Sequence, residues 1–299
     1  MSPTGRQDAL EEDQTLDSLQ DQVPSFKTER AAGQEHVEIT NWSALTSVRL
    51  AANVREALLI VAFGIVVIGG AELVVRALRI PAVILEPPSV IFGTLATNFV
   101  PVFLPFLLTT LEELGLGLLM GATIGLVLAA IITQRPLVEK IVTPYIIFLV
   151  TTPMLALVPL LQLQLGYGIA PKVIAVILAS GPMVMINSAT GFRRTDLAKI
   201  ALARSYGAST LQIFRYIRFP LALPMIIVGF MVGSIFGLLT AVGAEIVGGD
   251  QGLGSRLTFY SSYINMPMFF ATILLLALLG ITIYVIFYLI GKKWASWES

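Results

Sequence analysis

Six long apolar stretches constrain the fold of this chain more than any other feature of its sequence. The hydrocarbon core of a bilayer is about 30 Å thick, so a helix that crosses it needs roughly 20 apolar residues. Hydrophobic residues make up 56% of the chain and charged residues 13%, a balance typical of membrane proteins. We predict an all-α integral membrane protein with six transmembrane helices, near Ala57–Leu78, Phe106–Thr133, Ile141–Leu165, Pro171–Thr190, Leu221–Val247 and Met268–Gly291. A short amphipathic helix is expected at Val90–Phe99.

The segments that flank this transmembrane domain, residues 57–293, differ from it in composition. Residues 1–40 hold nine acidic and three basic residues and lack the short apolar core of a secretory signal. Low hydrophobicity with excess charge predicts a disordered acidic tail in the cytoplasm. Residues 41–56 alternate apolar and polar side chains, which favours an interfacial helix leading into the membrane. Residues 294–299 are predicted to be a short cytoplasmic tail.

Basic residues predict the orientation of the spans, because Lys and Arg are enriched in cytoplasmic loops. With the N-terminus in the cytoplasm, twelve flanking basic residues fall inside and four outside. The outer four are Arg76, Arg79, Lys172 and Arg256, and the inner twelve are Arg49, Arg55, Arg135, Lys140, Arg193, Arg194, Lys199, Arg204, Arg215, Arg218, Lys292 and Lys293. Both termini are therefore expected in the cytoplasm.

The longest basic segment, residues 195–224, reads as two short helices joined at a glycine. Asp196 is a helix N-cap residue, and Ser209 or Thr210 can cap a second helix. Gly207 supplies the backbone freedom for the turn between them. Leu197, Ile200 and Ala201 are expected to share the apolar face of the first helix, and Pro220 and Pro224 to end the second. On these grounds alone the segment is a helical hairpin at the membrane surface.

The spacing within this segment resembles the cytoplasmic signature of ATP-binding-cassette (ABC) importer permeases. That signature is Glu-Ala-Ala, three residues, a glycine, nine residues, and Ile-x-Leu-Pro. Ala201-Leu202-Ala203, Gly207 and Ile217-Arg218-Phe219-Pro220 keep its spacing, with Ala201 in place of Glu and Phe219 in place of Leu. The resemblance implies that loop 193–220 is a coupling helix that docks on an ATPase subunit, without a salt bridge from position 201. The implied coupling residues are Ala201, Leu202, Ala203, Gly207, Ala208, Ser209, Ile217 and Pro220.

From residue 87 to residue 293 the chain is similar to the nitrate/sulfonate/taurine-type branch of these permeases. The similarity rests on Pro87-Pro88-Ser89, the proline-broken stretch 151–160, Gly166-Tyr167-Gly168-Ile169 with Lys172, Ala244-Glu245, and Gly252-Leu253-Gly254. It implies a type I ABC importer permease fold in the bacterial cytoplasmic (inner) membrane. It also implies a dimer with a second permease copy or paralogue, two ABC ATPase subunits that bind ATP and Mg²⁺, and an extracytoplasmic solute-binding protein.

Several functional classes are excluded or disfavoured by what the sequence lacks. It has no GxxxxGK[ST], HExxH or GxSxG motif and no cysteine, and its one histidine, His36, lies outside the apolar region. We therefore expect no enzymatic activity, no metal site and no cofactor bound by this chain. Zero formal net charge gives no reason to expect nucleic-acid binding. An ion-coupled secondary transporter is the alternative, although no second inverted half matches the broken third span.

Polar residues at membrane depth are the candidates for contact with the solute, since such groups are costly unless they face a cavity or a partner. They are Glu112, Glu113, Thr152, Gln162, Gln164, Asn187 and Glu245. Oxyanion importers of this branch often carry a basic residue about where Glu113 lies, and an acid there disfavours a small anion. This favours a neutral or cationic organic solute, such as a pyrimidine, thiamine-precursor or flavin-like compound, over nitrate, a sulfonate or taurine. Alternatively, Glu112 and Glu113 bond locally at the outer interface, and Glu245 clamps the glycine-rich outer loop.

Glycines recur every four residues in two predicted spans, which brings small residues to one helix face and lets helices approach closely. The second span has Gly117, Gly121 and Gly125, for which we expect packing within the chain. The fifth span has Gly229, Gly233 and Gly237, for which the solute path or a permease–permease interface is a second possibility.

Overall fold

The computed structural model describes residues 54–294, and every regular element in that part of the chain is a helix. This confirms the all-α prediction. The predictions for the acidic segment 1–40, for most of the interfacial helix 41–56, and for residues 295–299 lie outside the described residues.

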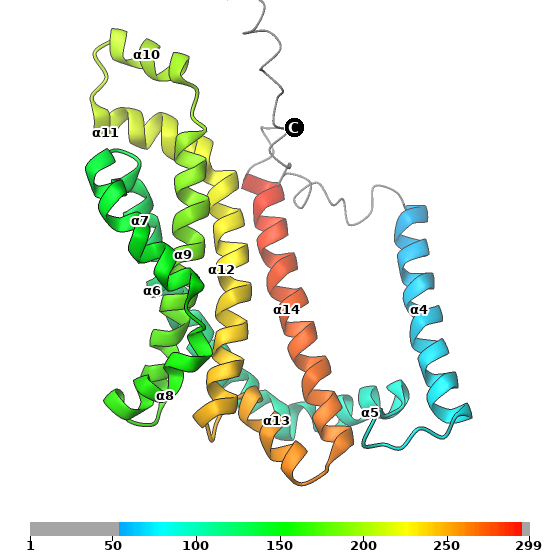
Figure 1. Cartoon of the computed structure of the whole chain (residues 1–299). Helices are drawn as coiled ribbons and strands as arrows, with labels where there is room; N and C mark the ends of the chain where they lie inside the picture. Colours follow the sequence, from blue (N-terminus) through cyan, green and yellow to red (C-terminus); the bar gives the residue numbers. More distant parts are fainter. Residues whose placement is uncertain (1–53, 295–299) are drawn as a thin grey trace, which may run out of the picture. The chain divides into compact units, whose positions relative to one another are not determined.

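Eleven α-helical segments and two π-helical turns follow one another along the chain (Figure 1). In order they are α4 (Val54–Ala77), α5 (Pro88–Asn98), η1 (Phe99–Phe103), α6 (Leu104–Ile132), α7 (Pro136–Thr151), α8 (Met154–Leu165), α9 (Ile169–Arg193), α10 (Leu197–Ser205), α11 (Thr210–Ile213), η2 (Phe214–Arg218), α12 (Phe219–Gly248), α13 (Leu253–Ser262) and α14 (Met266–Trp294). Among the described residues, five helical segments are long and apolar enough to cross a membrane, and the bent pair α7–α8 makes six. The predicted number of spans is thus confirmed.

The third predicted span is not one straight helix, which corrects the boundaries Ile141–Leu165. Its two halves, α7 and α8, meet at an angle of 96°. Thr152 and Pro153 between them have extended backbone, with ψ of 128° and 100°. Because Pro153 has no N–H and disfavours a helical conformation at Thr152, the helical hydrogen bonds of α7 cannot continue into α8.

The second span also differs from its prediction, because no loop separates it from the short helix before it. The π-helical turn η1 joins α5 directly to α6, so that residues 88–132 form one unbroken helical segment with a local change of winding. At the start of α5, Ser89 donates its backbone N–H (2.9 Å) and its hydroxyl (2.7 Å) to the Glu72 carboxylate of α4. The Pro87-Pro88-Ser89 motif therefore fixes the junction between α4 and α5.

The prediction that Pro220 and Pro224 end the second helix of the basic loop is wrong. The helical segment runs without a break from Thr210 to Gly248. Pro220 lies in the first turn of α12, directly after the π-helical turn η2, where the Phe219 N–H bonds the Phe214 carbonyl. Pro220 has no N–H to donate, and the π-turn directly before it shifts the hydrogen-bond register, which accommodates the proline without ending the helix. The loop is consequently continuous with the transmembrane segment that contains α12.

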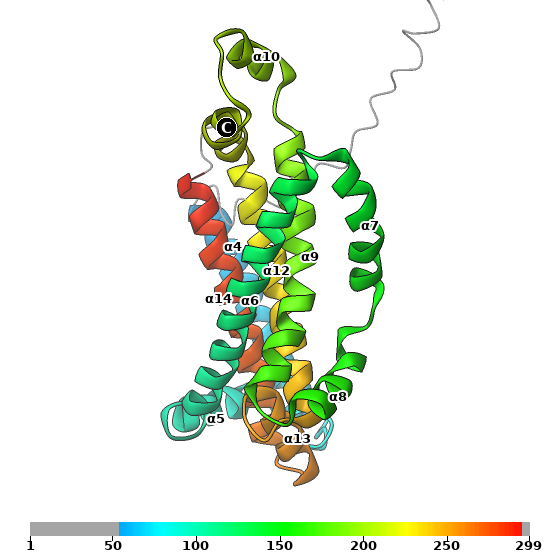
Figure 2. The same cartoon turned by 90° about the vertical axis from the view of Figure 1, so that its left-hand side faces the viewer.

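Helix α9 forms the centre of the described domain, packed between α6 and α12 (Figures 1 and 2). Gly117, Gly121 and Gly125 of α6 all face α9, and a Cβ atom at Gly125 would collide with the Gly181 carbonyl oxygen. The fifth-span glycines also face α9, with Gly229 against Val184 and Gly233 against Ser180 and Val184. Both glycine ladders therefore serve packing within the chain, and of the two possibilities for the second ladder these contacts support packing.

The ends of the long helices carry different structures (Figures 1 and 2). Helices α10 and α11 lie at one end of α9 and α12, and α5, α8 and α13 lie at the other. Two groups of side chains, one at each end, and a cavity between the ends are the candidate functional features.

Candidate functional site

Local hydrogen bonds build the basic loop in the way its sequence predicts. The Asp196 side chain accepts the Ala198 N–H (2.8 Å) at the start of α10. Gly207 has a φ of +79°, and the following Ala208 N–H bonds the Ala203 carbonyl at 3.0 Å. Ser209 and Gln212 then form a capping box, in which each side chain bonds the other residue's backbone N–H. We call α10, the turn at Gly207, α11 and η2 the elbow; hydrogen bonds on both sides of Gly207 define the ends of its two helices.

Buried aromatic and aliphatic side chains anchor this loop to the ends of the spans. Phe192 of α9, Phe214 of η2 and Phe219 of α12 form a cluster with ring centroids 5.0 to 6.5 Å apart. Ile200 and Ile213 are also buried. The expected apolar face of α10 is only partly correct, because Ile200 is buried whereas Leu197 is 78% exposed and Ala201 is exposed. Contacts with the rest of the protein therefore bury only Ile200 of the three residues on that face.

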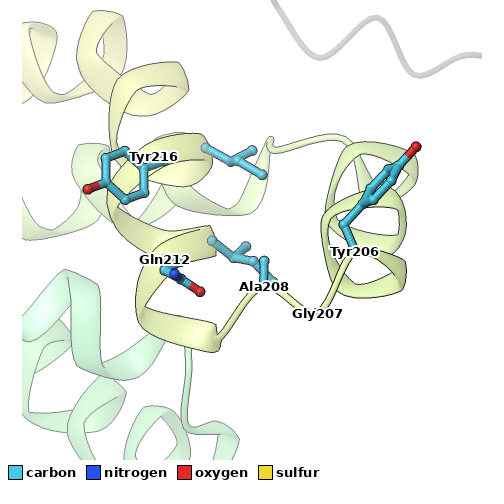
Figure 3. Close-up of a pocket in the computed structure, with 7 residues that line it drawn as sticks. Tyr206, Gly207, Ala208, Gln212 and Tyr216 are labelled. Atoms are coloured by element: carbon cyan, nitrogen blue, oxygen red, sulfur yellow. The ribbon is translucent and has the colours of Figure 1, made fainter.

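The opposite side of the loop leaves large apolar side chains uncovered. Tyr206 is 85% exposed, Leu211 74%, Tyr216 70% and Leu202 60%. The two tyrosines, Tyr206 and Tyr216, border a hollow of about 340 Å³, which we call the elbow hollow. Figure 3 shows Tyr206 on the α10 side of it, Tyr216 and Gln212 on the α11–η2 side, and Gly207 and Ala208 on the connecting loop. Exposed apolar side chains around a concavity, framed by fixed helices, are typical of a protein-binding surface.

The structure brings part of the predicted coupling set to the elbow hollow. Gly207, Ala208 and Ile217 line it, while Ser209 caps α11 beside it. Ala201 and Leu202 are exposed on α10, Ala203 is half-buried, and Pro220 is half-buried in the first turn of α12. Tyr206 and Tyr216, whose rings are large and exposed, were not predicted from the sequence. They could have been found as aromatic residues in a loop whose other exposed residues are mostly polar or basic.

At the other end of the helices, buried ionic side chains from three spans converge on the outer loop. Lys172 of α9 forms an ion pair with Glu113 of α6 (Nζ to Oε1, 2.7 Å), with side-chain exposures of 5% and 1%. The Lys172 ammonium also donates to the carbonyl of Gln251 at 3.2 Å. We call Glu113, Lys172, Glu245 and Thr110 the outer cluster, after the side of the membrane that the sequence predicts for them.

Glu245 of α12 completes this cluster by holding the glycine-rich loop. Its carboxylate accepts the Thr110 hydroxyl (2.7 Å) and the Gly254 N–H (2.6 Å), while Thr110 Oγ1 accepts the Leu253 N–H (3.0 Å). Gly252 has a φ of +97° and approaches the Glu245 carboxylate too closely for a Cβ atom to fit. Of the two roles expected for Glu245, these bonds fit the loop clamp.

The remaining candidates for solute contact do not converge on one site. Glu112 is exposed whereas Glu113 is buried, so the two residues point to different sides of α6. Gln162 is buried against Gly248, and Gln164 is exposed. Asn187 is half-buried and donates to the carbonyl of Met183 in its own helix (2.8 Å).

Thr152, another of these candidates, lines a cavity. A space of about 210 Å³ lies where α7 and α8 bend apart, against α9 and α12, and we call it the bend cavity. Its lining includes Leu155, Met183, Phe236 and Thr240 as well as Thr152. None of the described residues that line it is charged.

Outside the spans, the short helix α13 is fixed by an arginine between two aromatic rings. The Arg256 guanidinium lies 4.0 Å from the ring centroid of Phe106 and 5.0 Å from that of Phe259. Burial raises the pKa of the nearby Tyr260 phenol, an effect that the charge of Arg256 opposes. These contacts hold the outer loop and α13 in place beside the outer cluster.

Comparison with known proteins identifies the family. Residues 121–296 match the family of binding-protein-dependent transport system inner membrane components. The chain belongs to this family of ABC importer permeases. The matched region includes the whole elbow, the bend cavity and two of the three spans that build the outer cluster.

Three relatives illustrate the family, and the names of two of them include a solute. The chain is 30% identical over 175 residues to an ABC transporter permease protein of Haemophilus influenzae, covering 58% of this chain and 71% of that one. It is 30% identical over 161 residues to a riboflavin transport system permease of Chloroflexus aurantiacus (54% and 60% covered). It is 32% identical over 162 residues to an aliphatic sulfonates transport permease of Escherichia coli (54% and 61% covered).

The fold agrees with this assignment. A chain of the inward-facing MetNI methionine ABC transporter superimposes with a TM-score of 0.57 at 20% identity, covering 62% of this chain and 92% of the other. This likeness confirms the type I ABC importer permease fold, including its multi-pass arrangement.

Proposed function

We propose that this chain forms the solute pathway of an ABC importer together with a second permease copy or paralogue, and that loop 193–220 couples it to two ABC ATPase subunits. ATP and Mg²⁺ bind those partners, and this chain itself is no enzyme and carries no cofactor. An extracytoplasmic solute-binding protein delivers a small organic solute to the outer side. The site of action is the bacterial cytoplasmic (inner) membrane.

The exposed elbow is the observation that carries this proposal. Tyr206, Leu211 and Tyr216 are each at least 70% exposed, yet the caps around Gly207 hold the helices that bear them in fixed positions. Burying large apolar side chains in a partner's groove contributes about 1.5–3 kcal/mol for each one. Because Ala201 replaces the signature Glu, we assign the affinity for the ATPase to these side chains rather than to an ion pair at position 201.

The continuous helix from Thr210 to Gly248 supplies a route from that surface to the membrane. A displacement of the elbow by the closing ATPases moves α11, η2 and α12 together, since no flexible joint separates them. Helix α12 packs closely on α9 through its glycines, so α9 follows. Rigid-body movement of such packed elements is an established way to switch a membrane pathway between two states.

We further propose that the elbow end of the helices faces the cytoplasm, with both termini on that side. Support comes from the basic residues, because Arg193, Arg194, Lys199, Arg204 and Arg215 are exposed on or beside the loop at that end. Lys292 and Lys293 lie in the last turn of α14. The outer cluster, with its loop and α13, would then face the solute-binding protein.

Affinity purification of the tagged chain from its host in mild detergent, followed by mass spectrometry, tests the proposal. We expect an ABC ATPase and a solute-binding protein in amounts comparable to the chain. The alternative, an ion-coupled secondary transporter, predicts recovery of the chain alone or only with itself. It also predicts uptake driven by an ion gradient without added ATP, which would contradict the proposal.

A further inference from the structure

The bend cavity lies within the spans, where the break between α7 and α8 leaves main-chain groups without helical hydrogen bonds. It borders Leu178–Met183, near the middle of α9, and Phe236–Thr240, in the C-terminal half of α12. The carbonyl of Leu149, which also borders it, would bond residue 153 in an unbroken helix, but Pro153 has no N–H. Irregular backbone at this depth is tolerated where it lines a cavity rather than lipid. The break thus places main-chain hydrogen-bonding groups beside the cavity.

The side chains of the cavity wall are suited to an uncharged ligand. Thr152 donates its hydroxyl to the Phe148 carbonyl (2.7 Å) and Thr240 donates to the Phe236 carbonyl (2.8 Å). A hydroxyl whose hydrogen is used in this way keeps its oxygen lone pairs for N–H or O–H donors of a ligand. The remaining wall is apolar, with Leu155 and Phe236 partly exposed (47% and 44%).

The buried charged residues of the described spans do not line this cavity. Glu113, Lys172 and Glu245 are held in the outer cluster, by contacts with one another or with the outer loop. An ion entering the bend cavity would lose its hydration without gaining an opposite charge, which is a large cost in an apolar medium. A sulfonate therefore finds no cation there to offset its lost hydration, whereas a neutral ring compound loses little hydration free energy on entering the cavity.

From these observations we infer that the bend cavity is the wall of the pathway that contacts the solute, and that it takes an uncharged ring compound bearing N–H or O–H donors. The inference rests on the proposed function and adds a solute class to it. Sequence identity cannot make this choice, since the riboflavin and the sulfonate permeases are 30% and 32% identical to the chain. The chemistry of the cavity wall separates the two classes.

The absence of native cysteine permits a direct test with single thiols. Thr152→Cys places a thiol in the bend cavity, and Ser262→Cys places one on exposed α13, outside the spans; both native hydroxyls bond a carbonyl four residues earlier. The importer, assembled with its ATPase and binding protein in proteoliposomes, is treated with N-ethylmaleimide in the presence of riboflavin or of ethanesulfonate. The rate of thiol modification is measured for each variant.

We expect riboflavin to slow modification of Thr152→Cys several-fold and ethanesulfonate to leave it unchanged, while neither affects Ser262→Cys. Protection of Thr152→Cys by ethanesulfonate, or by neither compound, would overturn the inference. ATPase content is measured in the same sample. If the ATPase is missing, the proposed function fails as well; if it is present, only the assignment of the cavity fails.

Discussion

The ion pair between Lys172 and Glu113 gives the sharpest stability prediction. Replacing Lys172 with Met removes the ammonium and leaves the Glu113 carboxylate, 1% exposed, without its partner. Breaking a buried pair in this way costs about 3–5 kcal/mol, because the remaining charge is neither hydrated nor compensated. For a domain of this size each kcal/mol lowers the melting temperature by about 2–4 °C, so we expect a fall of roughly 6–20 °C.

A second ion pair of the same length provides the matched control. Arg193 and Glu139 also lie 2.7 Å apart, but their side chains are 50% and 39% exposed. Solvent screens such a pair, and Arg193→Met should cost no more than about 1 kcal/mol. A double variant, Glu113→Gln with Lys172→Met, removes both charges of this pair and should recover much of the loss.

The assay is the temperature at which half of the detergent-solubilised protein loses its monodisperse elution peak. Equal shifts for Lys172→Met and Arg193→Met would refute the reasoning, because burial would then make no difference. A double variant less stable than Lys172→Met would also refute it, since the unpaired charge could not be the source of the loss.

Two further substitutions test the elbow and the helix packing. Gly207→Val forces a β-branched residue to a φ of +79°, so ATP hydrolysis should continue while solute uptake falls several-fold. Gly166→Val changes a glycine with the same φ at the opposite end of the helices, and it should leave the ratio of uptake to ATP hydrolysis unchanged. Unaltered coupling in Gly207→Val would contradict the role of the elbow. Gly125→Ala places a methyl group against the Gly181 carbonyl and should cost about 1–3 kcal/mol, measured by the same thermal assay. Gly115→Ala in the same helix meets no atom and should be neutral or slightly stabilising, and similar losses in both variants would contradict the packing account.

The sequence predicted the parts of the structure that depend on local hydrogen bonds. Asp196, Gly207 and Ser209 act at the helix ends where their side chains or backbone freedom require. Such caps involve residues two to four positions apart, so their geometry is encoded within a few residues. The number of spans could also be predicted from the sequence, because the thickness of the bilayer sets the length of an apolar helix that crosses it.

Features that depend on contacts between distant segments were predicted poorly. The sequence does not show which of Glu112 and Glu113 faces the protein interior, since that choice depends on Lys172, 59 residues later. The second glycine ladder was open to two interpretations until α9 was seen against it. Proline propensity is local and predicts helix ends at Pro220 and Pro224, whereas the π-turn that accommodates Pro220 packs its Phe214 ring against Phe192 of a distant helix.

Cross-linking of the elbow to the ATPase tests the central claim most directly. Tyr206→Cys and Tyr263→Cys replace tyrosines of similar exposure, 85% and 72%, one in the elbow and the other after α13 at the opposite end of the helices. Each variant of the assembled importer is labelled with a photoreactive maleimide and illuminated. We predict a cross-linked product with the ATPase from Tyr206→Cys and none from Tyr263→Cys. A product from Tyr263→Cys, or none from Tyr206→Cys, would contradict the assignment of the elbow as the coupling surface.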